Sequence, residues 1–97
     1  MGVVHRPRTA WDSARVFVAA AECDVYWWLT GEVGRRLGLA YQESLARTRL
    51  RVQRRGDAVP AEAGAWRARL EDLLHDRPDL TPVLLRLTEE TAARLSR

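Results

Sequence analysis

The chain has 97 residues, the size of one small domain, and 46% of them are hydrophobic while 30% are charged. This composition is globular and excludes a disordered tail, a collagen-like chain and a disulfide-rich scaffold. The longest run without a charge, 25–31, is far shorter than the roughly 20 residues of a membrane-spanning helix, so we expect no membrane segment.

Charge is concentrated in one part of the chain. All 16 basic residues are arginine, which is typical of G+C-rich coding and also suits bidentate contacts to phosphate or carboxylate. Seven of them lie between residues 35 and 55 beside a single acid, Glu43. The only cysteine, Cys23, excludes an intrachain disulfide and suits a reducing compartment. We therefore expect a cytoplasmic protein, with Cys23 as a small core residue.

The first predicted helix follows an N-terminal arm. Residues 1–8 are predicted to be a flexible arm, and residues 9–97 a single helical domain in which Thr9 caps the first helix. Apolar residues at alternating spacings of three and four then predict one helix as far as Trp28. β-Branched and aromatic residues leave strand as the alternative for residues 15–29.

The second segment covers residues 30–55. Thr30 and Gly31 are expected to interrupt the pattern, and Gly56 is suited to the position after a helix. Two alternatives remain at Gly38. Either one continuous amphipathic helix extends from about residue 32 to residue 55, or a turn divides the segment into two helices.

Prolines mark the start of the last two predicted helices. Pro60 fits the first turn of a helix whose inner face is Trp66, Leu70, Leu73 and Leu74. Thr81 is predicted to cap the last helix, with Pro82 at its first position. Its predicted inner face comprises Leu84, Leu87, Thr88, Thr91 and Leu95. The fold class is therefore all-α, a compact bundle of four helices, or five if Gly38 breaks the second segment.

The residues that carry chemistry are few and scattered. His5, His75 and Cys23 belong to different predicted elements and lack the spacing of metal ligands. The glycines do not match a phosphate-binding loop. We expect a protein that is not an enzyme, with no metal, no cofactor and no small-molecule substrate.

Tryptophan is abundant for this length, with four residues. Trp27 and Trp28 are adjacent on a predicted helix, so at least one of them should face another element, another chain or solvent. Aromatic anchors are enriched at protein interfaces. The candidate interface residues are Trp27, Trp28, Val16 and Phe17. The leading hypothesis is a helical interaction or adaptor module that self-associates or binds a larger protein partner.

Residues 30–52, TGEVGRRLGLAYQESLARTRLRV, resemble the helix-turn-helix of bacterial DNA-binding proteins, with Gly38 at the turn. The family's second helix lies in the major groove, so the resemblance implies DNA binding as the alternative function. Ser44 stands where the family has an inward-facing hydrophobic residue, and Leu45 follows it. The candidate DNA-contacting residues are Tyr41, Gln42, Ser44, Arg47, Arg49, Arg51, Arg54 and Arg55.

A second resemblance covers the C-terminal third. Residues 66–96 contain a tryptophan-led helix, an acidic turn with proline and a leucine-rich helix. This stretch is similar to small all-helical adaptor and effector-associated modules of high-G+C bacteria. The resemblance implies helix packing against a protein partner.

Overall fold

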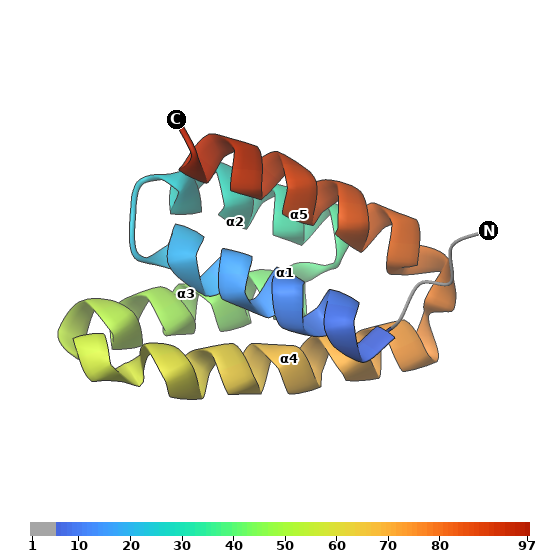
Figure 1. Cartoon of the computed structure of the whole chain (residues 1–97), viewed down its shortest axis with the longest axis horizontal. Coiled ribbons are helices and arrows are strands. Elements are labelled where there is room, and N and C mark those ends of the chain that lie inside the picture. Colours follow the sequence, from blue (N-terminus) through green and yellow to red (C-terminus); the bar gives the residue numbers. More distant parts are fainter. Residues whose placement is uncertain (1–5) are drawn as a thin grey trace.

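The computed structural model describes residues 6–97, which form an all-α bundle. The five α-helices and two short 3-10 helices are α1 (Arg6–Ala21), α2 (Val25–Arg36), α3 (Leu39–Arg54), η1 (Gly56–Ala58), α4 (Val59–Asp76), η2 (Pro78–Leu80) and α5 (Thr81–Leu95). Each α-helix runs in roughly the opposite direction to the one before it (Figure 1). Within the described range there is no strand, so the helical interpretation of residues 15–29 is confirmed.

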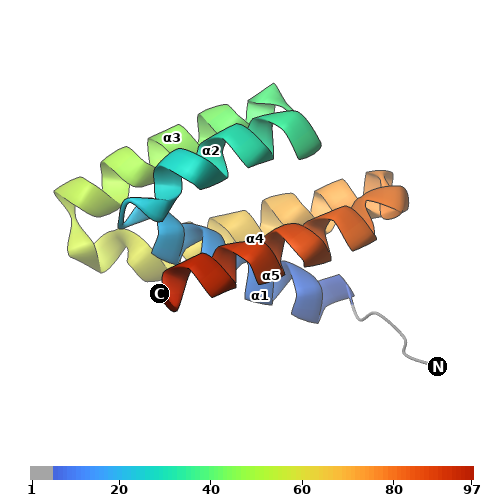
Figure 2. The ribbon, with the colours of Figure 1, turned by 90° about the horizontal axis from the view of Figure 1, so that it is seen from above.

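Two parts of the bundle are distinguishable. α1 packs most extensively against α4 and α5, while α2 and α3 pack mainly on each other. The hairpin of α2 and α3 lies along one side of the molecule, with α1, α4 and α5 on the other (Figure 2). The molecule is elongated along the helices, with extents of 41 × 26 × 23 Å.

The segment predicted to be one helix as far as Trp28 forms two helices, α1 and α2. The prediction of a continuous helix is therefore wrong. Tight turns end α1, since Glu22 N–H donates to the Ala19 carbonyl at 3.2 Å and Cys23 N–H donates to the Ala20 carbonyl at 3.1 Å. Cys23 is exposed in this connection and is not a core residue. The break turns the chain back, so that α2 can bury its own apolar side.

The start of α1 also differs from the prediction. The helix begins at Arg6, so residues 6–8 are helical and do not belong to an arm. Pro7 is compatible with this because proline is tolerated in the first helical turn. The remaining residues of the predicted arm, 1–5, lie outside the described part of the chain.

A turn at Gly38 separates α2 from α3, so the single-helix interpretation is wrong. The Gly38 backbone has a φ of 119°, which favours glycine because a Cβ would be strained there. The N–H groups of Leu37 and Gly38 both donate to the Val33 carbonyl, at 2.8 and 3.0 Å, and close the end of α2. The break expected at Thr30 and Gly31 is wrong as well, because both lie inside α2.

The last two helices form as their prolines predict, with proline in the first turn of both α4 and α5. All four predicted inner residues of α4 are buried, and so are Leu84, Leu87 and Thr91 of α5. Thr81 is the first residue of α5 and makes no capping hydrogen bond, so its predicted capping role is wrong. η2 leads directly into α5 and takes the place of a side-chain cap.

Trp66 lies at the centre of the core and is fully buried. Its ring meets the Phe17 ring edge-on, with 5.6 Å between centroids. Trp66 Nε1 donates to Thr48 Oγ1 at 2.8 Å, and Thr48 Oγ1 donates to Glu62 Oε1 at 2.7 Å. This buried network connects α3 to α4 and leaves the indole N–H satisfied.

Candidate functional site

The exposed apolar side chains gather on the α2–α3 hairpin. The large hydrophobic residues exposed in the described part of the chain are Trp11, Trp27, Leu39 and Leu50. Three of them lie on the hairpin, where Trp27 is 65%, Leu39 66% and Leu50 55% exposed, whereas Trp11 on α1 is 37% exposed. Apolar side chains gathered in this way commonly mark an interaction site.

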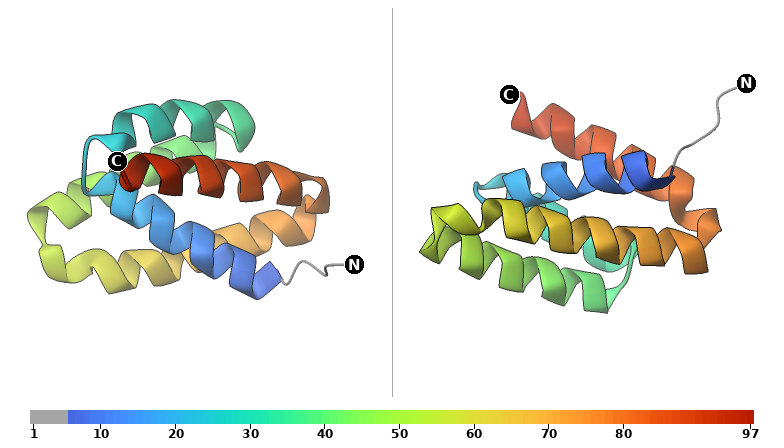
Figure 3. Two further views of the ribbon diagram at one scale, coloured as in Figure 1. Left: turned by 45° about the horizontal axis from the view of Figure 1, so that its top comes forward. Right: turned by 60° about the horizontal axis from the view of Figure 1, so that its bottom comes forward.

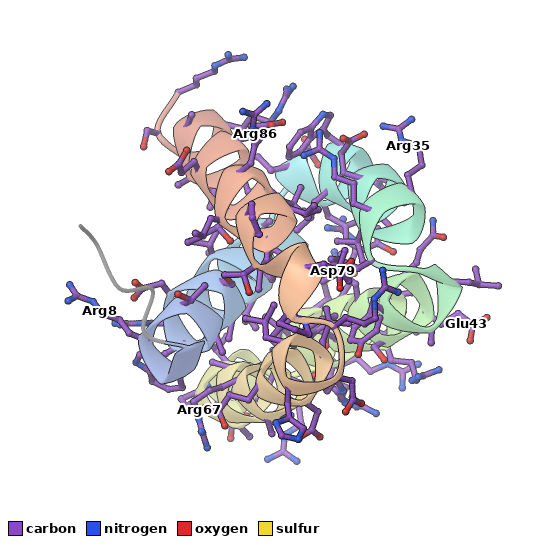
Figure 4. The ribbon with its side chains drawn as sticks, turned by 90° about the vertical axis from the view of Figure 1, so that its right-hand side faces the viewer. Arg8, Arg35, Glu43, Arg67, Asp79 and Arg86 are labelled. Atoms are coloured by element: carbon purple, nitrogen blue, oxygen red, sulfur yellow. The ribbon has the colours of Figure 1, made fainter. Side chains whose placement is uncertain are left out.

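The outer side of α3 carries a regular stripe. Leu39, Glu43, Ala46 and Leu50 follow spacings of four, three and four, which place them on one helix face. We call these four residues the outer α3 stripe. Leu45, Thr48 and Val52 occupy the opposite side and are buried. Figure 4 shows the Glu43 side chain projecting from α3 away from the bundle.

Trp27 is held in place although it is exposed. Its ring meets the Tyr26 ring edge-on at 5.0 Å, and the Arg49 guanidinium lies 5.1 Å from the Trp27 ring centroid. Arg49 also donates to the carbonyls of Ala21 and Cys23, at 3.2 and 3.0 Å. The indole is therefore attached to both the α1–α2 connection and α3, and presents a fixed apolar surface.

The other three predicted interface residues do not lie on the exposed side of the hairpin. Phe17 is fully buried against Trp66, so its assignment to an exposed interface is wrong. Val16 is half-buried on α1. Trp28 packs against the core and is covered by Arg94, whose guanidinium lies 4.0 Å from the ring centroid. Of the adjacent pair, Trp27 faces solvent and Trp28 faces the core, so the expectation that they do not share one environment is confirmed.

The residues expected to contact DNA bases turn toward the bundle. Tyr41 is half-buried, and burial, followed by the negative charges of Asp72 and Asp76, raises the pKa of its hydroxyl. Gln42 lies against Gly34, and its side chain leaves no room for a Cβ at that glycine. Ser44 receives a 3.4 Å hydrogen bond from Arg47.

The predicted basic face is partly neutralised by acids and carbonyls. Arg51 pairs with Glu62 at 3.3 Å and Arg55 with Asp57 at 3.2 Å, while Arg49 is bound to the carbonyls described above. Of the five predicted arginines, Arg47 and Arg54 are exposed and form no ion pair with a described residue. The view with the bottom of the molecule forward shows the C-terminal half of α3 beside the start of α4 (Figure 3, right); Asp57 belongs to η1 and Glu62 to the first turn of α4.

A shallow pocket opens at this junction, with a volume of about 490 Å³. It is lined by Arg51, Arg54, Arg55, Asp57, Ala58 and Ala61. Nothing in its lining combines a nucleophile with a general base. In residues 6–97 no group of three or more His, Cys, Asp or Glu side chains is arranged to hold a metal ion.

Comparison with known proteins finds no relative of this chain. The chain matches no family model, no curated protein and no solved structure. None of the helices in the described range is long and apolar enough to cross a membrane. The outer α3 stripe was missed from the sequence, although Leu39 and Leu50 are eleven residues apart, about three helical turns, and so share one side of α3.

Proposed function

We propose that this protein is a non-catalytic helical interaction module that binds a protein partner through the outer side of the α2–α3 hairpin. The observation that carries the proposal is the exposure of Trp27, Leu39 and Leu50 on this one hairpin. Leaving such side chains in water forgoes roughly 25 cal/mol for each Å² of apolar area that a partner could cover. A covering protein chain would recover that free energy.

The rigidity of Trp27 further supports an interface role. An anchor already held in its bound orientation loses little conformational entropy on association. Arg49 and Tyr26 hold the indole in this way. A cytoplasmic location is part of the proposal, because Cys23 is an exposed free thiol of the kind that persists in reducing compartments.

Site-specific photo-cross-linking in the native cell tests the proposal. A benzophenone amino acid replaces Leu50, and a matched control carries it at Arg86, which is exposed on α5 and projects from another part of the bundle (Figure 4). We expect a discrete protein adduct at position 50 and none at position 86. The adduct, identified by mass spectrometry, should form again between purified components. Equal labelling at both positions, or none at either, would overturn the proposal.

DNA binding is the second candidate, and the turn at Gly38 favours it because the helix-turn-helix resemblance requires one. It ranks second because Tyr41 and Gln42 face the bundle and because acids neutralise Arg51 and Arg55. A titration with duplex DNA at low salt tests it directly. Saturable binding that weakens steeply with salt would establish it, and the lack of any binding would exclude it.

A further inference from the structure

We propose that the partner is a second copy of this chain, bound through antiparallel pairing of the outer α3 stripes. This inference rests on the proposed function, because it uses the same exposed side of the hairpin. It goes further by naming the occupant and the register. Three features of α3 and its surroundings carry it: the spacing of the stripe, the distribution of charge along the helix, and the position of Trp27.

The stripe is self-complementary. Its spacings of four, three and four read the same in both directions along the helix. When two copies of α3 run antiparallel, Leu39 of one copy therefore lies beside Leu50 of the partner subunit. The two-fold axis of this dimer passes between Glu43 and Ala46, where the small alanine side chain lets the two helices approach closely. A two-fold interface of this kind uses the same patch on both copies.

Charge along α3 selects the antiparallel arrangement. Two arginines in the C-terminal half of α3, Arg47 and Arg54, are exposed and form no ion pair with a described residue, and the N-terminal half carries the acid Glu43. A parallel pair would place one basic half directly against the other. In the antiparallel pair Glu43 comes within one helical position of Arg47 of the partner subunit, so that opposite charges meet near the two-fold axis. Opposite charges facing each other across an interface fix register.

Trp27 extends the contact beyond α3. Because α2 and α3 are antiparallel, Trp27 at the start of α2 lies beside the C-terminal half of α3, next to Arg49. Antiparallel pairing brings the N-terminal end of the partner's α3 to this same place. Leu39 of the partner subunit would therefore be enclosed between Leu50 and Trp27, and the three exposed apolar side chains of each copy would be covered together.

The first measurement is molar mass by light scattering after size exclusion, across a concentration series at low and high salt. We expect a dimer that persists at high salt, because apolar contacts hold it together. Leu50→Ser should raise the dissociation constant at least tenfold, as loss of an interface anchor does. Trp11→Ser, which removes an exposed apolar side chain on α1, is the matched control and should leave the constant unchanged.

A charge-reversal pair tests the register itself. Glu43→Arg alone and Arg47→Glu alone should each be monomeric, since like charges then meet across the two-fold axis. An equimolar mixture of these two variants should associate again, because each arginine finds a glutamate on the other copy. Both residues are exposed, so circular dichroism should show that both variants remain folded.

The two proposals fail in different ways. A wild-type monomer at millimolar concentration would overturn the dimer, as would a dimer indifferent to Leu50→Ser or a mixture that stays monomeric. An adduct at position 50 with a different protein would overturn the dimer while supporting the proposed function. An adduct with the chain itself would support both.

Discussion

The two parts of the bundle use their apolar residues differently. In the part formed by α1, α4 and α5, the largest fully buried side chains, Trp66 and Phe17, pack against each other, and Trp11 is 37% exposed. The α2–α3 hairpin also buries residues, including Leu29 and Leu45, but it leaves Trp27 and Leu50 exposed. The hairpin therefore has apolar residues on two sides, and those on its inner side belong to the buried core. This contrast separates residues that hold the fold from residues available to a partner.

The largest effect that distinguishes the two parts is expected from a pair of tryptophan substitutions. Trp66→Ala should lower the free energy of unfolding by about 3–5 kcal/mol, because it opens a cavity and removes the indole donor to Thr48 Oγ1. This loss is a large fraction of the roughly 5–15 kcal/mol that stabilises a domain of this size. Urea unfolding followed by circular dichroism measures the change.

Trp27→Ala is the matched control for that experiment. At a protein concentration low enough to keep the chain monomeric, it should change the free energy of unfolding by less than about 1 kcal/mol, as exposed substitutions usually do. Comparable losses for the two variants would contradict the division between a folding part and a binding part.

Much of this division could be predicted from the sequence, but not all of it. The inner stripe of α4 was predictable because Pro60 marks the helix start and Trp66, Leu70, Leu73 and Leu74 share one face. The break at residues 22–24 was hidden because Ala21, Val25 and Trp28 keep the spacing of one continuous helix across it. The position of this break depends on long-range packing, which lets α2 fold back on the bundle. Hydrophobic periodicity carries no signal of such packing.

The exposed side of the hairpin was harder to predict for a similar reason. The sequence alone does not show which of Trp27 and Trp28 is exposed. Their rings are contacted by Arg49 of α3 and Arg94 of α5, respectively, and these helices come later in the chain. Phe17 was named from the sequence as a candidate interface residue. It is buried because α4 supplies Trp66 to cover it. Sequence patterns show how many apolar faces a helix has, but not which neighbours cover them.

The second prediction concerns the buried polar network between the two parts. Thr48→Val should lower the free energy of unfolding by about 1–3 kcal/mol, because Trp66 Nε1 loses its acceptor and Glu62 Oε1 loses a donor in a buried site. Thr91→Val is the control, since Thr91 is equally buried but its hydroxyl donates to the Leu87 carbonyl of its own helix. That variant should lose less than about 0.5 kcal/mol, because the carbonyl keeps its helical partner.

Thermal unfolding of both threonine variants, with Thr48→Ser alongside, measures these losses. Thr48→Ser keeps the hydroxyl and should retain most of the stability that Thr48→Val loses. If the valine variants at positions 48 and 91 are equally stable, the network does not connect the hairpin to α4 in the way its geometry indicates.

The smallest expected effects come from two glycines of the hairpin, and they have opposite signs. Gly38→Ala should destabilise by about 1–2 kcal/mol, because alanine is strained at a φ of 119° in the turn that joins α2 to α3. Gly31→Ala should stabilise by about 0.5–1 kcal/mol, since Gly31 lies inside α2 and an added Cβ meets nothing within 4 Å. Melting temperatures of the two variants measure both changes. A gain in stability from Gly38→Ala would indicate that the turn is not required. The hairpin could then straighten, and the separation of an outer face from an inner face on α3 would lose its structural basis.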